Sequence, residues 1–155
     1  MINPMLSRRR LGFSIAGVAV SLATASAAAA PPPVTVYKDP NCGCCSGWVT
    51  HMRRAGFAVT VVERADLTPL RRTLGVPDTA LSCHTAVVGG YFVEGHVPVS
   101  DVRRLLAEKP AARGIAAPGM PIGSPGMEAP GGRIEPYAVV MIGRDGRTSV
   151  FSRHS

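Results

Sequence analysis

Four cysteines carry the chemistry that this sequence can support. Cys42, Cys44 and Cys45 fall within a four-residue stretch, and Cys83 lies far downstream, directly before His84. Cys42 and Cys45 have the C-x-x-C spacing, with a strand-like segment before them and a helix-like segment after them. At such a helix start, free backbone N–H groups and the helix dipole favour a thiolate over a thiol. The spacing therefore suits a nucleophile in disulfide exchange and equally a metal ligand.

Cys44 is one thiol more than an ordinary dithiol oxidoreductase needs. If Cys42 pairs with Cys45, then Cys44 is free, reaches Cys83 or binds something else. Several thiolates facing one point raise each other's pKa values, and a bound cation removes that penalty. Thiolates prefer soft cations, which indicates Cu(I), Zn(II) or an iron–sulfur cluster. Adjacent thiolates fit one tetrahedral zinc ion poorly and suit bridging of several Cu(I) ions, so copper is favoured over zinc.

Two histidines and two methionines are secondary ligand candidates. His84 follows Cys83, and His96 precedes a predicted helix at what we expect to be the same rim. Met120 and Met127 lie in a Gly/Pro-rich stretch with little core to fill, and their thioethers would extend a copper site. Each has a structural alternative, since a histidine at a strand start is often only hydrogen-bonded and a methionine often fills a gap.

The elements around the cysteines follow from the hydrophobic pattern. Apolar residues that alternate predict strands, and a period near 3.6 predicts helices. In chain order we predict a strand at 34–38, a helix at 46–55, a strand at 57–62, a short helix with Thr68 as N-cap that ends at Gly75, a hairpin of 85–88 and 91–94, and a helix at 100–108. This β-α-β-α-β-β-α order is that of a thioredoxin-like α/β core, with its first two strands parallel. Trp48 should pack beneath the sulfur atoms, and His51 should lie either at the surface or at the site.

A segment of different composition follows this predicted core. Residues 110–136 contain six Pro and six Gly among 27 residues, which predicts neither helix nor strand. A connection of that length is usually functional or disordered. Because an extra C-terminal hairpin of 137–142 and 148–151 follows, we expect this Gly/Pro/Met-rich loop to lie over the domain.

The N-terminus has the features of an export signal. Arginines at 8–10 precede an apolar stretch at 11–22 and a small-residue tail at 23–30. We therefore predict a signal peptide at 1–30, of the twin-arginine or the general type, and a single periplasmic domain at 31–155. No membrane span is expected after removal of the signal.

The charge of the predicted domain is modest. Three arginines belong to the signal, so the remainder has 14 basic and 10 acidic side chains, a net charge of +4. The basic residues come in scattered pairs such as Arg71-Arg72, which we assign to solvated helix faces. Nucleic acid is therefore not an expected partner.

Four ordered motifs resemble those of the CopG-type exported metal-binding proteins. They are Tyr37-Lys38-x-Pro40-x-Cys42-Gly43-Cys44-Cys45-x-x-Trp48, Ser82-Cys83-His84-Thr85-Ala86, Glu94-Gly95-His96-Val97-Pro98, and Gly119-Met120-Pro121-x-Gly123-Ser124-Pro125-Gly126-Met127-Glu128. The resemblance implies a thioredoxin-like domain that binds Cu(I) through Cys42, Cys44, Cys45 and Cys83. It further implies a role in copper resistance, with interconversion of Cu(I) and Cu(II). Expected partners are copper ions and other exported copper-handling or redox proteins.

Two rival hypotheses stay open beside the copper protein. In the first, the chain is a thiol–disulfide oxidoreductase, with Cys42 as the attacking thiol and Cys45 as the resolving thiol. In the second, it is a binding module whose fold is stabilised by zinc or by disulfides. Such a module would unfold on addition of a chelator or reductant. Only the copper cluster requires Cys44. Whether the protein is an enzyme, as a copper oxidoreductase would be, is left open by the residues themselves.

Overall fold

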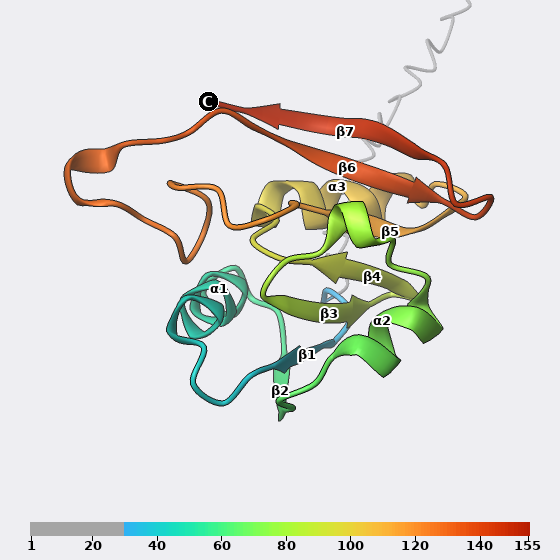
Figure 1. Ribbon diagram of the computed structural model, residues 1–155, viewed down its shortest axis with the longest axis horizontal. Helices are drawn as coiled ribbons and strands as arrows, with labels where there is room; N and C mark the ends of the chain where they lie inside the picture. Colours follow the sequence, from blue (N-terminus) through green and yellow to red (C-terminus); the bar gives the residue numbers. More distant parts are fainter. Residues whose placement is uncertain (1–29) are drawn as a thin grey trace, which may run out of the picture.

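The computed structural model describes residues 30–155, and the predicted signal peptide lies outside this range except for Ala30. The described residues form a mixed α/β fold with one seven-stranded sheet and three α-helices (Figure 1). The strands are β1 (Val34–Lys38), β2 (Val59–Glu63), β3 (His84–Val88), β4 (Tyr91–Glu94), β5 (Ala112–Ala116), β6 (Tyr137–Gly143) and β7 (Thr148–His154). The α-helices are α1 (Gly43–Arg54), α2 (Thr68–Leu74) and α3 (Val99–Glu108), and short 3-10 turns lie at Asp78–Ala80 and Pro130–Gly132. None of the helices in residues 30–155 is long and apolar enough to cross a membrane.

The strands are arranged in the order β2-β1-β3-β4-β5-β6-β7. β1 and β2 are parallel, as predicted, and β4 and β5 are also parallel. The other neighbours are antiparallel, including β1 with β3, where Lys38 is opposite His84. This register brings the end of β1 and the start of β3 to the same edge of the molecule.

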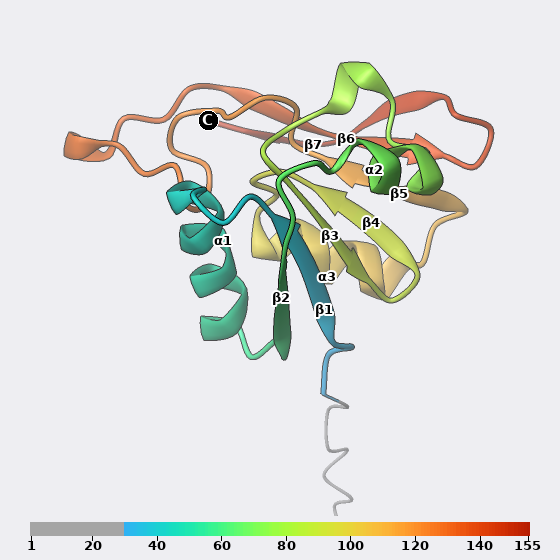
Figure 2. The same ribbon diagram turned by 60° about the horizontal axis from the view of Figure 1, so that its bottom comes forward.

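Helices cover both faces of the sheet. α1 and α3 pack on one face and place Trp48, Met52, Val102 and Leu105 in the main core, together with inward-facing strand residues such as Val36. On the other face, Val76 and Ala80 pack against Phe92 and Ile142 in a smaller core beside α2. Figure 2 shows α2 in front of the sheet and α3 behind it. Burial on both faces explains why the central strands are apolar almost throughout.

Most predicted elements are confirmed within a few residues. Gly75 ends α2 in the left-handed conformation, with φ of 72°, and Gly89 and Gly90 make the two-residue hairpin turn with φ of 55° and 84°. Two boundaries differ. α1 begins at Gly43, so that Cys44 and Cys45 lie in its first turn, and the N-cap of α2 is Leu67 and not Thr68.

The prediction that residues 110–136 contain no strand is wrong. β5 occupies Ala112–Ala116 in the middle of the sheet, between β4 and β6. The high Pro and Gly content of the whole segment predicted no strand. It did not reveal the short run at 112–116 that ends in the apolar residues Ile115 and Ala116. Gly114 is not a turn residue here, because a Cβ at this position would collide with the backbone carbonyl of Phe92 on β4. As a result the C-terminal hairpin continues the sheet, and the rest of the loop, 117–136, joins two adjacent strands.

Candidate metal centre

The cysteines meet because of the sheet register. β1 ends at Lys38, and the turn that follows is closed by the backbone N–H of Asn41, which donates to Asp39 Oδ1 at 2.8 Å. Cys42 is the N-cap of α1, and its Sγ accepts the backbone N–H of Cys45 at 3.4 Å. Cys83 directly precedes β3, whose first residue is opposite the last residue of β1. Two segments that are far apart in the sequence therefore place their sulfur atoms together.

The four sulfur atoms all lie within 4.8 Å of one another. Cys42 and Cys45 form a disulfide, which answers the pairing question that the sequence left open. The Sγ of Cys44 lies 3.5 Å from that of Cys42 and 3.9 Å from that of Cys83, and both Cys44 and Cys83 are free thiols. Cys45 is completely buried, whereas the other three are partly exposed. The centre is thus open to solvent on the side of Cys42, Cys44 and Cys83.

Both histidine candidates lie against Cys83. The Nε2 of His96 is 2.9 Å from Cys83 Sγ, and the Nδ1 of His84 is 3.5 Å from it. Both rings are fully buried, with their centroids 5.1 Å apart in an edge-to-face arrangement. Trp48 packs against the ring of His84, with 4.7 Å between the ring centroids. Its Nε1 donates to the carbonyl of Val97 at 2.8 Å. The prediction that Trp48 packs beneath the sulfur atoms is consistent with this arrangement.

Burial controls the protonation of these groups. It raises the pKa of the Cys83 thiol to about 12, with a further contribution from the charge of Cys44. Burial also lowers the pKa of His84 to about 3 and lowers the pKa of His96. Near neutral pH the site therefore presents neutral imidazoles and a protonated Cys83. A thiolate at Cys83 requires a compensating cation, because the buried site disfavours isolated charge.

The Gly/Pro-rich loop lies against the first turns of α1, as expected, and Figure 1 and Figure 2 both show it beside that helix. Gly126 contacts Gly47 so closely that a Cβ on Gly47 would be 2.9 Å from the Cα of Gly126. Glu128 holds the same stretch through its Oε1, which accepts the backbone N–H of Gly126 at 2.9 Å and pairs with His51 Nε2 at 2.5 Å. His51 therefore fastens the loop to α1.

The two methionines differ in exposure. Met120 is 54% exposed, whereas Met127, directly after Gly126, is partly buried. The contacts that hold the loop come from its backbone and from Glu128. The thioether ligands stay a prediction.

Gly126→Ala is expected to lift the loop from α1. Its φ is 88°, and a Cβ there would lie 2.5 Å from the carbonyl oxygen of Cys44 and 2.7 Å from the backbone nitrogen of Trp48. Gly131→Ala is the matched control, since its φ is 78° but nothing lies within 4 Å of the added Cβ. Left-handed strain of ~1–2 kcal/mol is common to both variants. The steric clash should cost Gly126→Ala roughly 1–3 kcal/mol more in denaturant unfolding. Equal losses would show that the loop does not need this contact.

A buried ion pair that the sequence analysis did not predict holds the segment on either side of Cys83. Glu94 of β4 is completely buried and lies 2.7 Å from Arg71 of α2. Its Oε1 accepts the backbone N–H of Ser82 at 2.9 Å, and its Oε2 accepts the hydroxyl of Thr85 at 2.5 Å. Arg71 in turn donates to the carbonyl of Ser82 at 2.5 Å. The pair thus binds both the backbone N–H and the carbonyl of Ser82, the residue before Cys83.

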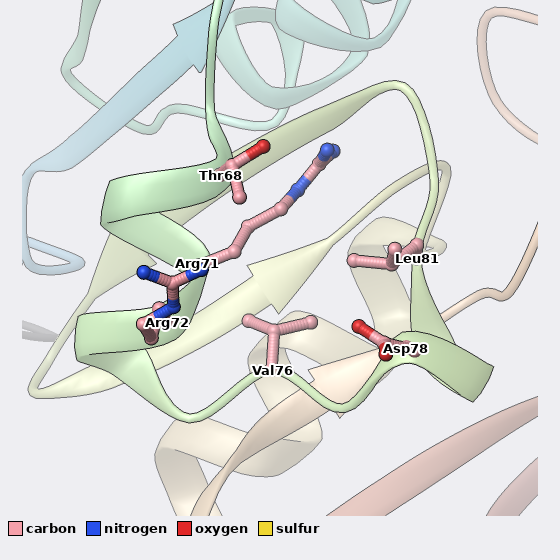
Figure 3. A pocket seen from close by; sticks show the side chains of 6 residues that line it. All are labelled: Thr68, Arg71, Arg72, Val76, Asp78 and Leu81. Carbon is pink, nitrogen blue, oxygen red and sulfur yellow. The ribbon is translucent and has the colours of Figure 1, made fainter.

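Placing both Arg71 and Arg72 on a solvated face is therefore wrong for Arg71. Its side chain is only 18% exposed, while Arg72 is exposed. The two residues line a pocket with Thr68, Val76, Asp78 and Leu81, and Figure 3 shows the side chain of Arg71 extending across it, away from Arg72. Glu94 could have indicated this ion pair in the sequence, because it is an acidic residue at the end of an otherwise apolar strand. A carboxylate that is buried there requires a buried partner.

Comparison with known proteins gives matches over most of the chain. A family model described as "Protein of unknown function, DUF411" matches residues 80–127, which include Cys83, His84, His96, Met120 and Met127. The structure of a copper resistance protein CopG in a first form has 46% sequence identity and a TM-score of 0.76, and the match covers 80% of this chain and 98% of that chain. A second form has the same identity and TM-score, with 81% of this chain and 99% of that chain covered. No curated protein matches.

Proposed function

Because the chain belongs to the CopG family of copper resistance proteins, as its motifs indicated, we propose that it binds Cu(I) in a cysteine thiolate cluster. The ligands are Cys42, Cys44, Cys45 and Cys83, and the role is copper resistance or homeostasis. One observation carries the proposal: Cys83 joins the three clustered cysteines, and all four sulfur atoms lie within 4.8 Å of one another. Disulfide exchange between Cys42 and Cys45 has no use for this fourth sulfur.

The donor set fits Cu(I) better than other ions. Four sulfurs with two adjacent imidazoles form a soft site, whereas magnesium and calcium need oxygen ligands. Cys44 and Cys45 are consecutive, which favours thiolates that bridge several Cu(I) ions over a single tetrahedral zinc. The cation also compensates the charge of Cys83, whose burial otherwise raises its pKa to about 12.

Bound copper would supply one-electron chemistry between Cu(I) and Cu(II), in keeping with the interconversion that the resemblance implies. The residues of the chain hold the site and limit its access to water. Trp48 lies on the buried side, and Gly126 of the loop packs against the backbone of α1 at Cys44, Gly47 and Trp48. Hydrogen bonds and burial around the sulfur atoms would set the potential.

We also propose that residues 34–108 are a thioredoxin-like unit, within one exported domain at 31–155. The order β1-α1-β2-α2-β3-β4-α3 supports the first statement, together with the parallel pair β1 and β2 and the antiparallel β3 and β4. The charged, apolar and small-residue regions of residues 1–30 support export to the periplasm. Other exported copper-handling or redox proteins are the proposed partners.

Anaerobic Cu(I) titration of fully reduced 31–155 protein tests the cluster. We expect more than one Cu(I) per chain, and a lower stoichiometry in Cys44→Ser and in Cys83→Ser. Ser46→Ala is the control, because Ser46 is exposed in the same turn of α1 and should leave the stoichiometry unchanged. At most one weakly held ion, with no change in either cysteine variant, would contradict the proposal.

A thiol–disulfide oxidoreductase is the second candidate, and the Cys42–Cys45 disulfide favours it. The partly exposed Cys42 is available for attack, and the buried Cys45 is placed to resolve a mixed disulfide. Cys44→Ser separates the two functions. Unchanged disulfide reduction by this variant, with unchanged copper tolerance of cells that produce it, would favour the second candidate.

A further inference from the structure

Lys38 occupies a core position at the end of β1. Val34 and Val36 are buried in the main core, and by the alternation of a strand the side chain of Lys38 points the same way. Lys38 is only 4% exposed. Lysine is almost never buried to this extent unless its charge is paired. A buried cation in line with two core valines therefore needs a reason of its own.

No carboxylate pairs with this ammonium group in the described part of the chain. Its Nζ donates to the backbone carbonyl of Asp39 at 2.8 Å and to that of Pro40 at 3.4 Å. The carboxylate of Asp39 accepts the backbone N–H of Asn41 instead, at 2.8 Å. Lys38 thus supports the turn that leads into Cys42, and the two carbonyls that it contacts do not neutralise its charge.

The sheet register places this charge on the side of the metal centre. Lys38 is opposite His84 in the pairing of β1 with β3, and opposite residues of neighbouring strands have their side chains on the same face. The Nδ1 of His84 lies 3.5 Å from Cys83 Sγ. Burial is the main cause of the low pKa of His84, about 3, and the charge of Lys38 contributes to it. The ammonium group therefore acts on a ring that contacts the cluster.

We propose that the ammonium group of Lys38 compensates the negative charge of the thiolate cluster and favours Cu(I) over Cu(II) in it. This inference rests on the proposed function and deepens it. Four thiolates that hold fewer than four Cu(I) ions carry a net negative charge, which a buried cation nearby stabilises. Reduction of Cu(II) to Cu(I) by one electron adds one more negative charge to the site. The cation therefore stabilises the reduced form more than the oxidised form.

Arg71 is the internal comparison. It is a second cation near Cys83, since its guanidinium donates to the carbonyl of Ser82 at 2.5 Å. Glu94, 2.7 Å away, neutralises its charge. Lys38 has no such partner among the described residues, so its charge is the one available to an anionic centre.

Two substitutions of Lys38 separate its charge from its hydrogen bonds. Lys38→Met removes both, and a methionine suits a position in line with Val34 and Val36. Lys38→Gln removes the charge and keeps an N–H donor for the turn. Lys109→Gln is the matched control, because Lys109 is exposed at the end of α3 and its substitution removes the same charge from the chain.

Both Lys38 variants are expected to bind Cu(I) at least about ten times more weakly in an anaerobic competition titration of the reduced 31–155 protein. A redox titration of protein loaded with one copper per chain, followed through the EPR signal of Cu(II), measures the potential. It should fall by about 60 mV, the one-electron equivalent of a tenfold change. Lys109→Gln should leave both quantities unchanged. Circular dichroism checks that the variants fold, and the potential of either Lys38 variant decides the question if the other does not.

The outcomes separate this inference from the proposed function. Unchanged affinity and potential in Lys38→Gln would overturn the role of the charge and leave Lys38 only its support of the turn. An equal fall in Lys109→Gln would show a general effect of net charge and would overturn it as well. In both cases the thiolate cluster stands if the unaltered protein binds several Cu(I) ions. Failure of the reduced, unaltered protein to bind Cu(I) at all would overturn both proposals.

Discussion

Reduced protein is expected to bind more Cu(I) per chain than protein in which the Cys42–Cys45 disulfide is closed. The disulfide removes two of the four thiols and leaves Cys44 and Cys83, 3.9 Å apart, as the thiol ligands. Two sulfurs can hold one ion between them but cannot support a bridged cluster. We expect at most one Cu(I) in the oxidised protein and several after reduction.

Anaerobic titration of both forms against a Cu(I) chelator measures this difference, with a thiol assay to confirm two or four free thiols. The reduced double variant Cys42→Ser/Cys45→Ser is the matched control. It has the same two thiols as the oxidised protein and should bind the same amount of Cu(I). Equal binding by oxidised and reduced protein would contradict the four-cysteine site.

Arg71→Leu is expected to cause the largest loss of stability. It would leave the carboxylate of Glu94, which is completely buried, without its counter-charge. Removing one partner of a buried ion pair costs about 3–5 kcal/mol, because the remaining charge is uncompensated. Arg72→Leu changes the adjacent, exposed residue of the same helix and should alter the unfolding free energy by no more than ~0.5 kcal/mol.

The loss in Arg71→Leu should depend on pH. Burial raises the pKa of Glu94 above its ordinary value, and Arg71 opposes this rise. Without Arg71 the folded-state pKa rises further, so the variant loses stability as the pH rises through that value. Denaturant unfolding of the oxidised proteins should therefore show a smaller loss near pH 4.5 than at pH 7. If Arg71→Leu and Arg72→Leu unfold alike at both pH values, the ion pair does not support the Ser82 segment.

Local features of the chain could be predicted where neighbouring residues decide them. The helix after the cysteines follows from the spacing of Trp48, Val49 and Met52, which are buried on one face of α1. The hairpin turn at Gly89-Gly90 follows from two residues that tolerate positive φ. In both cases the physical cause lies within a few residues of sequence.

The predictions from sequence were wrong where contacts between residues far apart in the chain outweigh local composition. Gly114 looked like a loop residue, but β5 needs it because Phe92 on the neighbouring strand leaves no room for a Cβ. Arg71 looked like a surface residue, but a carboxylate from β4 lies 2.7 Å away in the folded chain. Neither partner could be identified from the sequence, since both are brought close only by the assembled sheet.

By itself, the sequence determined that Cys42, Cys44 and Cys45 meet at a helix start, because residues this close cannot separate. It also indicated the family, through motifs that the matches to CopG structures confirm. Only the tertiary structure decided which groups complete the centre. Pairing of β1 with β3 places Lys38 opposite His84, which brings Cys83 to the cysteines at the start of α1. His96, which follows β4, then lies against Cys83. Sheet register is a property of the whole fold, and it brings Cys83, His84 and His96 to the three clustered cysteines.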